Sequence, residues 1–297
     1  MMRVASLLIL AVLGTGLAAQ TSAKPPAASP RQPHVVFVTG DDEYRSEISM
    51  PMIAAILEKR HGMKTSVAYA RPRPQAQNHI EGLEALETAD LMVMFTRYRA
   101  LPDAELNRIL AYVKSGKPLV GFRTSTHAFN YPAGSPHTDL NDGFGLETWG
   151  QKWITHHGHT STTAVTRQPG ATHPILNGVD DFAAQSWLYH VEPLNGPATI
   201  LLNGRSVGSE KKDTTKWPLT QPVAWTREHD GARVFFTTLG HPGDFEQPAM
   251  RRLAVNGILW ALGRDVPKGG ADATPASPYV APPPFDLATG LPLKPRP

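Results

Sequence analysis

The chain has 297 residues, a formal net charge of +3, twelve histidines and no cysteine. The missing cysteine excludes disulfides, thiolate metal sites and every mechanism with a cysteine nucleophile. Basic residues are scattered and matched by acidic ones, so the charge does not indicate a nucleic-acid partner. The length suits one large α/β domain or two small ones.

The N-terminal residues 1–23 have the pattern of a secretory signal peptide. Arg3 gives a positive start, residues 4–19 form an apolar run, and small residues follow. The run is short for a membrane span, and no later segment is apolar enough to cross a bilayer. An uncleaved anchor is the alternative. Residues 24–33 are a proline-rich linker. We therefore expect a periplasmic or secreted protein with no membrane span after cleavage.

Short apolar segments alternate with helical patterns from His34 onward. Pro51 and Gly62 mark the two ends of the first helix. Alternation of this kind implies right-handed crossovers and a parallel sheet. The predicted strands are residues 34–40, 64–69, 91–95 and 118–122, and the predicted helices are residues 49–61 and 102–115.

The middle section, residues 124–195, is rich in Gly, His, Trp and turn residues, which predicts loops and short strands added to the sheet. Beyond it, strands are predicted at 199–202, 222–226 and 233–239, and a last helix at 248–262. The folded domain is thus expected at residues 34–263. Residues 264–297 are again proline-rich, and we expect a tail that lies over the domain or in solvent.

Polar residues follow several of the predicted strands, and ligands of open parallel sheets bind at the carboxyl ends of the strands. Because functional groups concentrate on loops held by a rigid scaffold, we expect these loops to form one site. Arg97 and Arg123 could hold a carboxylate or a developing oxyanion, or they could pair structurally with acids of the first loop. The candidates are Asp41, Asp42, Glu43, Arg97, Arg99, Arg123, His127 and His241.

Histidines are bunched in the middle section, where His156, His157 and His159 share one segment and His190 follows. On a strand, the spacing of 157 and 159 puts two imidazoles on one face, and imidazole is a common metal ligand. The alternative is a polar loop whose histidines bond backbone carbonyls. Since no HExxH-like spacing is present, we assign no metal and keep His156, His157 and His159 only as candidates.

Several short motifs occur together in the chain. They are VTGD (38–41), GFR (121–123), HPI (173–175), PVAWTR (222–227), GARVF (231–235), TLGHP (238–242), RR (251–252), NGI (256–258) and WALG (260–263). Together they resemble the ThuA-like (trehalose utilisation) family, a branch of the class I glutamine amidotransferase-like superfamily. The resemblance covers residues 34–263. It implies an α/β flavodoxin-like three-layer sandwich with a mostly parallel central sheet, and a link to carbohydrate use.

The turn after the strand at 118–122 departs from the pattern of that superfamily. Its amidotransferases carry a cysteine there, whereas this chain has Arg123 and no cysteine at all. Glutaminase chemistry through a thiolate is therefore excluded. Many ThuA-like proteins have a histidine near this position. Here His127, a turn further on, could substitute for it.

These observations predict an exported enzyme, a hydrolase, lyase or isomerase, that acts on a sugar or keto-sugar by acid–base chemistry. A ketone acidifies the neighbouring C–H, so a histidine or carboxylate could remove that proton while an arginine stabilises the enolate. The predicted catalytic residues are His241, His127 and Arg123. The predicted residues for binding the carbohydrate ligand are Asp41, Asp42, Glu43, Arg97, Arg99, Trp187 and His190.

Two other classes of function remain open. A non-catalytic carbohydrate-binding protein would need exposed tryptophans and histidines with ordinary pKa values, although core packing is the more frequent use of Trp. A metal-dependent hydrolase would use the clustered histidines as ligands. The tryptophans of the middle and following sections are Trp149, Trp153, Trp187 and Trp217. The sequence indicates neither a cofactor nor an oligomeric state.

Overall fold

The computed structural model describes residues 31–286 and 288–292. The predicted signal peptide and most of the predicted linker lie outside these residues. Within the described ranges, no helix is both long and apolar enough to cross a membrane.

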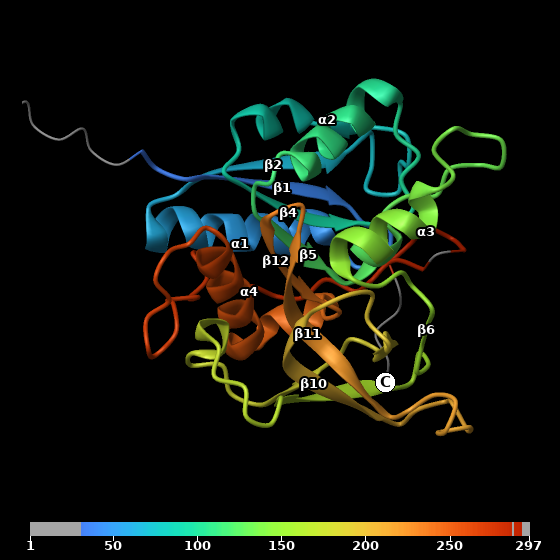
Figure 1. The fold of residues 1–297 in the computed structure, drawn as a ribbon, viewed down its shortest axis with the longest axis vertical. Helices are drawn as coiled ribbons and strands as arrows, with labels where there is room; N and C mark the ends of the chain where they lie inside the picture. Colours follow the sequence, from blue (N-terminus) through green and yellow to red (C-terminus); the bar gives the residue numbers. More distant parts are fainter. Residues whose placement is uncertain (1–30, 287, 293–297) are drawn as a thin grey trace, which may run out of the picture. The chain divides into compact units, whose positions relative to one another are not determined.

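A ten-stranded sheet forms the centre of the described domain, in the order β3-β2-β1-β4-β5-β12-β11-β10-β7-β8 (Figure 1). Its strands are β1 (His34–Gly40), β2 (Lys64–Ala70), β3 (Ile80–Glu81), β4 (Leu91–Thr96), β5 (Leu119–Phe122), β7 (Thr162–Arg167), β8 (Phe182–Ala184), β10 (Thr199–Val207), β11 (Thr220–His229) and β12 (Ala232–Thr237). A separate two-stranded sheet pairs β6 (Thr155–His156) with β9 (Tyr189–His190).

The five central strands β2, β1, β4, β5 and β12 are mutually parallel. Antiparallel strands extend the sheet at both edges. Numbered by themselves, the parallel strands have the order 2-1-3-4-5, which is the flavodoxin-like arrangement. The strand order reverses between β1 and β4, so the loops after these two strands flank the crevice where such sheets bind ligands.

Helices cover both faces of the sheet, which gives three layers (Figure 1). One face carries α1 (Ser46–His61) and α4 (Pro248–Ala261), and the other carries α2 (Asp103–Lys114) with the 3-10 helix η1 (Leu83–Thr88). The predicted three-layer α/β sandwich is therefore confirmed. The shorter helices are η2 (Arg123–His127), α3 (Leu140–Phe144), the π-helical η3 (Gly145–Trp149), η4 (Pro174–Leu176) and η5 (Pro242–Glu246).

Alternation along β1 explains why this strand must be covered on both sides. Val35 and Phe37 point into the core under α1 and α4, whereas Val36 and Val38 point into the core under α2. Successive side chains of a strand face opposite sides of the sheet, and all four are fully buried. A continuous apolar run is therefore the expected sequence for this position.

Residues 264–286 and 288–292 contain no helix or long strand, yet this part of the C-terminal segment lies on the domain. The Asn256 side chain donates to the carbonyls of Ile175 and Asn177 and accepts from the Ala271 N–H, each at 2.9 Å. Further on, the Phe285 N–H donates to the Glu43 carbonyl at 2.8 Å. The tail was expected to lie either over the domain or in solvent. These contacts show that its described residues lie over the domain.

Candidate functional site

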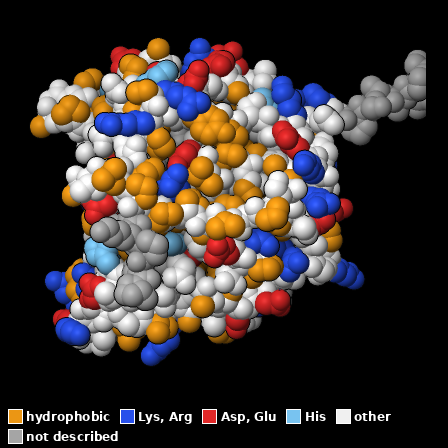
Figure 2. Space-filling model, turned by 180° about the vertical axis from the view of Figure 1, so that it is seen from behind, with side chains coloured by type: hydrophobic (Ala, Val, Ile, Leu, Met, Phe, Trp, Pro, Cys, Tyr) orange, Lys and Arg blue, Asp and Glu red, His pale blue; other side chains and the backbone are white. Residues whose placement is uncertain are grey.

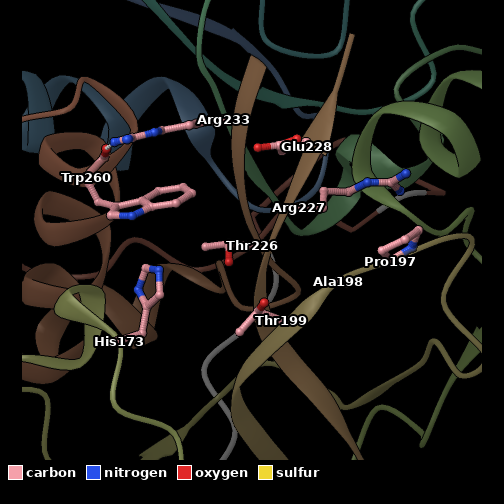
Figure 3. A pocket seen from close by; sticks show the side chains of 9 residues that line it. All are labelled: His173, Pro197, Ala198, Thr199, Thr226, Arg227, Glu228, Arg233 and Trp260. Carbon is pink, nitrogen blue, oxygen red and sulfur yellow. Dashed lines mark hydrogen bonds between the residues drawn. The ribbon is translucent and has the colours of Figure 1, made fainter. Parts of the chain in front are cut away.

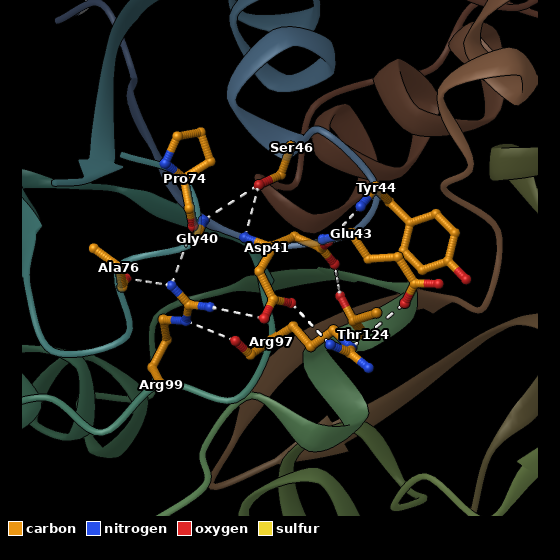
Figure 4. Close-up of polar contacts among 11 residues, drawn as sticks. Gly40, Asp41, Glu43, Tyr44, Ser46, Pro74, Ala76, Arg97, Arg99 and Thr124 are labelled. Atoms are coloured by element: carbon orange, nitrogen blue, oxygen red, sulfur yellow. Dashed lines mark hydrogen bonds and ion pairs between the residues drawn. The ribbon is translucent and has the colours of Figure 1, made fainter. Parts of the chain in front are cut away.

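The loop after β1 is fixed by a buried carboxylate. Asp41 is fully buried, and its Oδ1 accepts from the N–H groups of Glu43 (2.6 Å) and Tyr44 (2.5 Å) (Figure 4). This is the turn geometry that an aspartate at the end of a strand favours. The Thr124 hydroxyl donates to the other carboxylate oxygen, so Asp41 also ties this loop to the turn after β5.

The loop after β4 brings two arginines to the same edge (Figure 4). Arg97 donates from Nη1 to Asp42 at 2.9 Å, and its Nε lies 3.5 Å from Oε2 of Glu43. Arg99 is fully buried and donates to the carbonyls of Arg97 (2.6 Å) and Ala76 (2.5 Å). Two roles were expected for Arg97: holding a ligand anion, or pairing with acidic residues of the first loop. The structure shows the ion pairs with the first loop. The hydrogen bonds of Arg99 instead fix the backbone around the loop.

Glu43 is the acidic residue of this site whose pKa best suits proton transfer at neutral pH. Glu43 is only 7 % exposed to solvent. Burial raises its pKa to about 7, and the positive charges of Arg97 and Arg123 only partly oppose this effect. A carboxyl group with a pKa near 7 can both accept and donate a proton at neutral pH.

The turn after β5 places a buried arginine under aromatic rings. Arg123 has a left-handed backbone, with φ of 38°, and its side chain is fully buried. Its guanidinium donates to the Thr238 carbonyl at 2.9 Å and to the Tyr44 hydroxyl at 3.1 Å. The guanidinium carbon lies 4.3 Å from the ring centroid of Tyr44 and 4.5 Å from that of Tyr189. The positive charge of Arg123 is therefore stabilised by cation–π attraction to these two rings. The charge of Arg97, by contrast, is stabilised by carboxylate partners.

His127 lies in the same turn and is also buried. Its Nδ1 is 3.0 Å from the Thr126 hydroxyl, and its ring packs against Tyr98 and Trp153. Burial lowers its pKa well below the ordinary value, and the charges of Arg97 and Arg123 act in the same direction. His127 is therefore a neutral ring at neutral pH, suited to hydrogen bonding rather than to donating a proton as an imidazolium.

His241 caps η5 at the end of β12. Its Nδ1 accepts from the Gly243 N–H at 3.0 Å, so in the neutral ring the proton is on Nε2. Asp244 accepts from the N–H groups of Gly240 (3.0 Å) and His241 (3.1 Å), which fixes the backbone of this turn. The ring centroids of His241 and Tyr44 are 6.1 Å apart. The loop after β12 therefore reaches the loop after β1.

The middle section covers this group of loops. Trp187 is 4 % exposed, and its ring packs edge-on against Tyr44 at a centroid distance of 6.0 Å. On its other side it contacts the rings of His156 (5.0 Å) and His159 (4.4 Å). Burial lowers the pKa of His156 to about 4, and the charge of Arg123 adds to the effect. His156 is therefore neutral under ordinary conditions.

The clustered histidines do not share one face. β6 ends at His156, and Gly158, with φ of 107°, turns the chain so that the His159 ring returns to within 4.7 Å of the His156 ring. His157 points away and pairs its Nδ1 with the Ser209 hydroxyl at 2.9 Å. Because β6 ends at His156, residues 157 and 159 do not lie on a strand, and the strand spacing that would put their rings on one face does not apply. In the described part of the chain, no group of three or more His, Asp or Glu side chains is arranged to hold a metal.

Two aromatic residues of the site, Tyr44 and Tyr189, were not among the site residues predicted from the sequence. Tyr44 belongs to the predicted loop after β1, and its position there was the available signal. Tyr189 lies in the irregular middle section, where no periodic pattern marks it. The structure places His190, a predicted ligand-binding residue, next to Trp217, with ring centroids 5.1 Å apart.

Comparison with known proteins decides the family. The sequence model of the ThuA family, described as trehalose utilisation, matches residues 34–261. The chain belongs to the ThuA family. This confirms the resemblance seen in the sequence motifs. No curated protein matches the sequence.

Solved structures of two ThuA-like proteins have a similar fold. The protein from Bacteroides uniformis is 16 % identical with a TM-score of 0.54, and the match covers 84 % of this ThuA-family chain and 98 % of that chain. The protein from Parabacteroides merdae is 18 % identical with a TM-score of 0.53, and the match covers 82 % and 96 %. At these identities the likeness establishes the fold alone.

Proposed function

We propose that this ThuA-family chain is an enzyme that moves a proton on a sugar or keto-sugar derivative, with Glu43 as the principal acid–base group. The observation that supports the proposal is the position of Glu43. Its carboxyl group is nearly buried between Arg97 and Arg123, and its pKa is raised to about 7. A strongly shifted acid beside specific charges at a ligand-binding edge is typical of functional sites.

The proposed step is removal of a proton from the carbon next to a ketone. The Glu43 carboxylate takes the proton, the C–H electron pair forms a C=C bond, and the carbonyl π electrons move to the oxygen. Arg97 is the partly exposed cation that can face this oxygen and stabilise its negative charge. In an α-hydroxy ketone, the α-hydroxyl proton then moves to the enolate oxygen and the proton on Glu43 returns to the former carbonyl carbon, so that the carbonyl group changes place and the sugar is isomerised. Departure of a substituent at the β carbon instead gives elimination.

The other residues support this step in different ways. Arg123 is buried, so it acts through the Tyr44 hydroxyl to which it donates. His241 has Nδ1 occupied by the Gly243 N–H, which makes Nε2 the nitrogen that can donate to a leaving oxygen. His127 is neutral and serves as a hydrogen-bonding group. These roles refine the assignment made from the sequence, where His241 and His127 shared the acid–base work.

The carbohydrate-binding alternative has less support. It needs exposed tryptophans, but Trp149 and Trp187 are 0 % and 4 % exposed. It also needs histidines with ordinary pKa values, whereas those of His127 and His156 are lowered. For the metal-dependent hydrolase, the divergence of His157 from His156 and His159 removes the shared ligand set on which that hypothesis depended.

Deuterium exchange tests the proposal. The protein is incubated in D₂O with a panel of keto-sugars, and NMR follows deuterium incorporation at the carbon next to the ketone. We expect exchange with the unmodified chain and a loss of about 100-fold or more with Glu43→Gln, the range of general acid–base catalysis. Glu47→Gln is the matched control, because Glu47 is half-buried and its pKa is also raised, but it pairs with Arg45 at 2.6 Å.

The outcomes separate the proposed functions. Equal exchange rates for the unmodified protein and Glu43→Gln would rule out Glu43 as the acid–base group. No exchange with any keto-sugar, combined with a thermal shift by an unoxidised sugar, would favour the carbohydrate-binding alternative.

A further inference from the structure

The cavity drawn in Figure 3 does not bring its charged side chains to one point. It has a volume of about 510 Å³, and residues of β11 and β12 form part of its lining. In the β11–β12 ladder Arg227 pairs with Val234 and Arg233 pairs with Glu228, so the two arginine side chains point to opposite faces of the sheet. They cannot hold one ligand group together. Unused hydrogen-bonding atoms instead lie close to one another beside the Glu43 site.

Tyr189 carries a hydroxyl group to which no described residue forms a hydrogen bond. The residue is 3 % exposed, and the guanidinium carbon of Arg123 lies 4.5 Å from its ring centroid. The β6–β9 ladder, in which Tyr189 pairs with His156, holds the ring there. A buried polar group without a partner is costly, and such a group in a native fold calls for an explanation. A ligand that bonds to this hydroxyl would supply one.

His127, in the turn after β5, has a ring nitrogen in the same state. The Thr126 hydroxyl donates its single proton to the Arg123 carbonyl at 3.2 Å, so it accepts from Nδ1 of His127, which is 3.0 Å away. In the neutral ring Nε2 then carries no proton and can only accept. Within the described part of the chain no group donates to Nε2, although His127 is only 6 % exposed.

The donor and the acceptor are neighbours next to the proposed acid–base group. The ring centroids of Tyr189 and His127 are 6.4 Å apart. On its other sides the His127 ring packs against the half-buried Tyr98, at a centroid distance of 5.0 Å. The guanidinium carbon of Arg97 lies 4.2 Å from the Tyr98 ring centroid, and Arg97 is the ion-pair partner of Glu43. One aromatic ring therefore separates His127 from the arginine that pairs with Glu43.

We propose that the Tyr189 hydroxyl and Nε2 of His127 form a subsite for one hydroxyl group of the ligand. Tyr189 donates to the ligand oxygen, and the ligand hydroxyl donates to Nε2. A hydroxyl group both donates and accepts, whereas a carbonyl or carboxylate oxygen can only accept. The inference rests on the proposed function for the position of the ligand, and it narrows the substrate class to keto-sugars that keep a free hydroxyl close to the ketone.

Deuterium exchange with monodeoxy analogues tests the subsite. Each keto-sugar that the unmodified protein exchanges is compared with analogues that lack one hydroxyl group. We expect one analogue to exchange about 100-fold more slowly, because its missing hydroxyl leaves two buried groups unpaired. In Tyr189→Phe the parent sugar should slow by about tenfold or more while that analogue keeps its rate. Comparing the two proteins cancels the intrinsic reactivity of each compound.

Thermal unfolding gives a readout that needs no ligand. Because the Tyr189 hydroxyl has no partner among the described residues, Tyr189→Phe should leave the melting temperature unchanged or raise it. Tyr131→Phe is the matched control, since Tyr131 is also buried but its hydroxyl donates to the Leu101 carbonyl at 2.9 Å. This control should lower the melting temperature by about 2–4 °C and leave the preference for the hydroxylated sugar unchanged.

The outcomes separate this inference from the proposed function. A loss of stability in Tyr189→Phe as large as in Tyr131→Phe, or exchange that depends on no single hydroxyl, would overturn the subsite and leave the chemistry of Glu43 standing. If no keto-sugar exchanges, thermal shift by the same sugars and analogues replaces the rate. A shift that needs one ligand hydroxyl and Tyr189 would support the subsite and contradict the proposed chemistry. Silence in both measurements would overturn both.

Discussion

The Nε of Arg97 lies 3.5 Å from Oε2 of Glu43, yet the pKa of Glu43 is raised rather than lowered. Burial is the larger effect, because Arg97 already donates to Asp42 at 2.9 Å and shares its charge with that partner. Arg97 therefore stabilises the ionised form of Glu43 in part, and at neutral pH the ionised and protonated forms of Glu43 are both populated. The pH dependence of stability and of activity follows from this balance.

The first prediction concerns stability against pH. The pKa of Glu43 is about 7 in the folded chain and near 4.5 in the unfolded chain. Between these values the folded state binds more protons, so the stability contributed by Glu43 falls as pH rises, by up to ~1.4 kcal/mol per pH unit. Glu43→Gln should lose this dependence. In urea unfolding from pH 5 to 8, its stability relative to the unmodified chain should rise up to pH 7 and then level off. A constant difference would contradict the shifted pKa.

The second prediction concerns His156. Because burial is the main reason for its pKa of about 4, removing part of its cover should raise the pKa toward 6.5. Trp187→Leu removes the ring that lies 5.0 Å from it. An NMR titration of the imidazole measures the change, and Trp260→Leu, which removes an indole of α4 that packs against His173, is the control. An unchanged pKa in Trp187→Leu would show that the indole does not shield His156.

Two glycines in consecutive helical segments make a third test. A Cβ at Gly145 would lie 2.0 Å from the Thr126 carbonyl oxygen, so Gly145→Ala should destabilise the fold by about 1–3 kcal/mol and disturb the turn that carries Arg123. Gly143 has no atom within 4 Å of that position, and Gly143→Ala should stabilise by up to ~1 kcal/mol. Urea unfolding measures both. Equal effects would be inconsistent with the close packing of η3 on η2.

The fourth prediction concerns Asp244. Its carboxylate accepts from the N–H groups of Gln185 (2.6 Å), Ser186 (3.1 Å), Gly240 and His241, and it is fully buried. Asp244→Asn replaces one accepting oxygen with a donor, so it should cost at least ~2 kcal/mol and loosen the turn that carries His241. Asp213→Asn is the control, since Asp213 makes a similar turn on the exposed β10–β11 hairpin. Its effect should stay within about 0.5 kcal/mol. Thermal unfolding compares the two.

The parallel core could be predicted from the sequence because its signals are local. Runs such as those of β1 and β4 are long, apolar and bounded by polar loops, and the observed bounds differ from the expected ones by a residue or so. The first helix begins at Ser46, three residues before the expected start. The convergence of the loops followed from the topology. Contacts such as Thr124 with Asp41 and Arg97 with Asp42 show that these loops do meet.

The environment of each side chain was harder to predict, because burial depends on distant segments. His127 was expected to act as an acid–base group, but Tyr98 and Trp153 pack against it and burial lowers its pKa. Trp149 was a candidate for an exposed tryptophan, yet it is fully buried against Phe236 of β12. No periodic pattern in residues 124–195 predicted the helix and π-helix that carry this tryptophan inward.

On the face shown in Figure 2, acidic and basic side chains are mixed, without a continuous basic band. This agrees with the scattered charges of the sequence.

The position of β12 beside β5 has a consequence for the time course of folding. Residues 123–231 separate two neighbouring parallel strands, and the hydrogen bond from Arg123 to the Thr238 carbonyl spans 115 positions. Until β12 is synthesised and docks, β5 is an edge strand with unpaired backbone groups, which favours pairing with other chains. Contacts of such long range also slow folding. The nascent domain therefore depends on its last strand and helix to close the sheet, and the residues around Arg123 are among the last to reach their final positions.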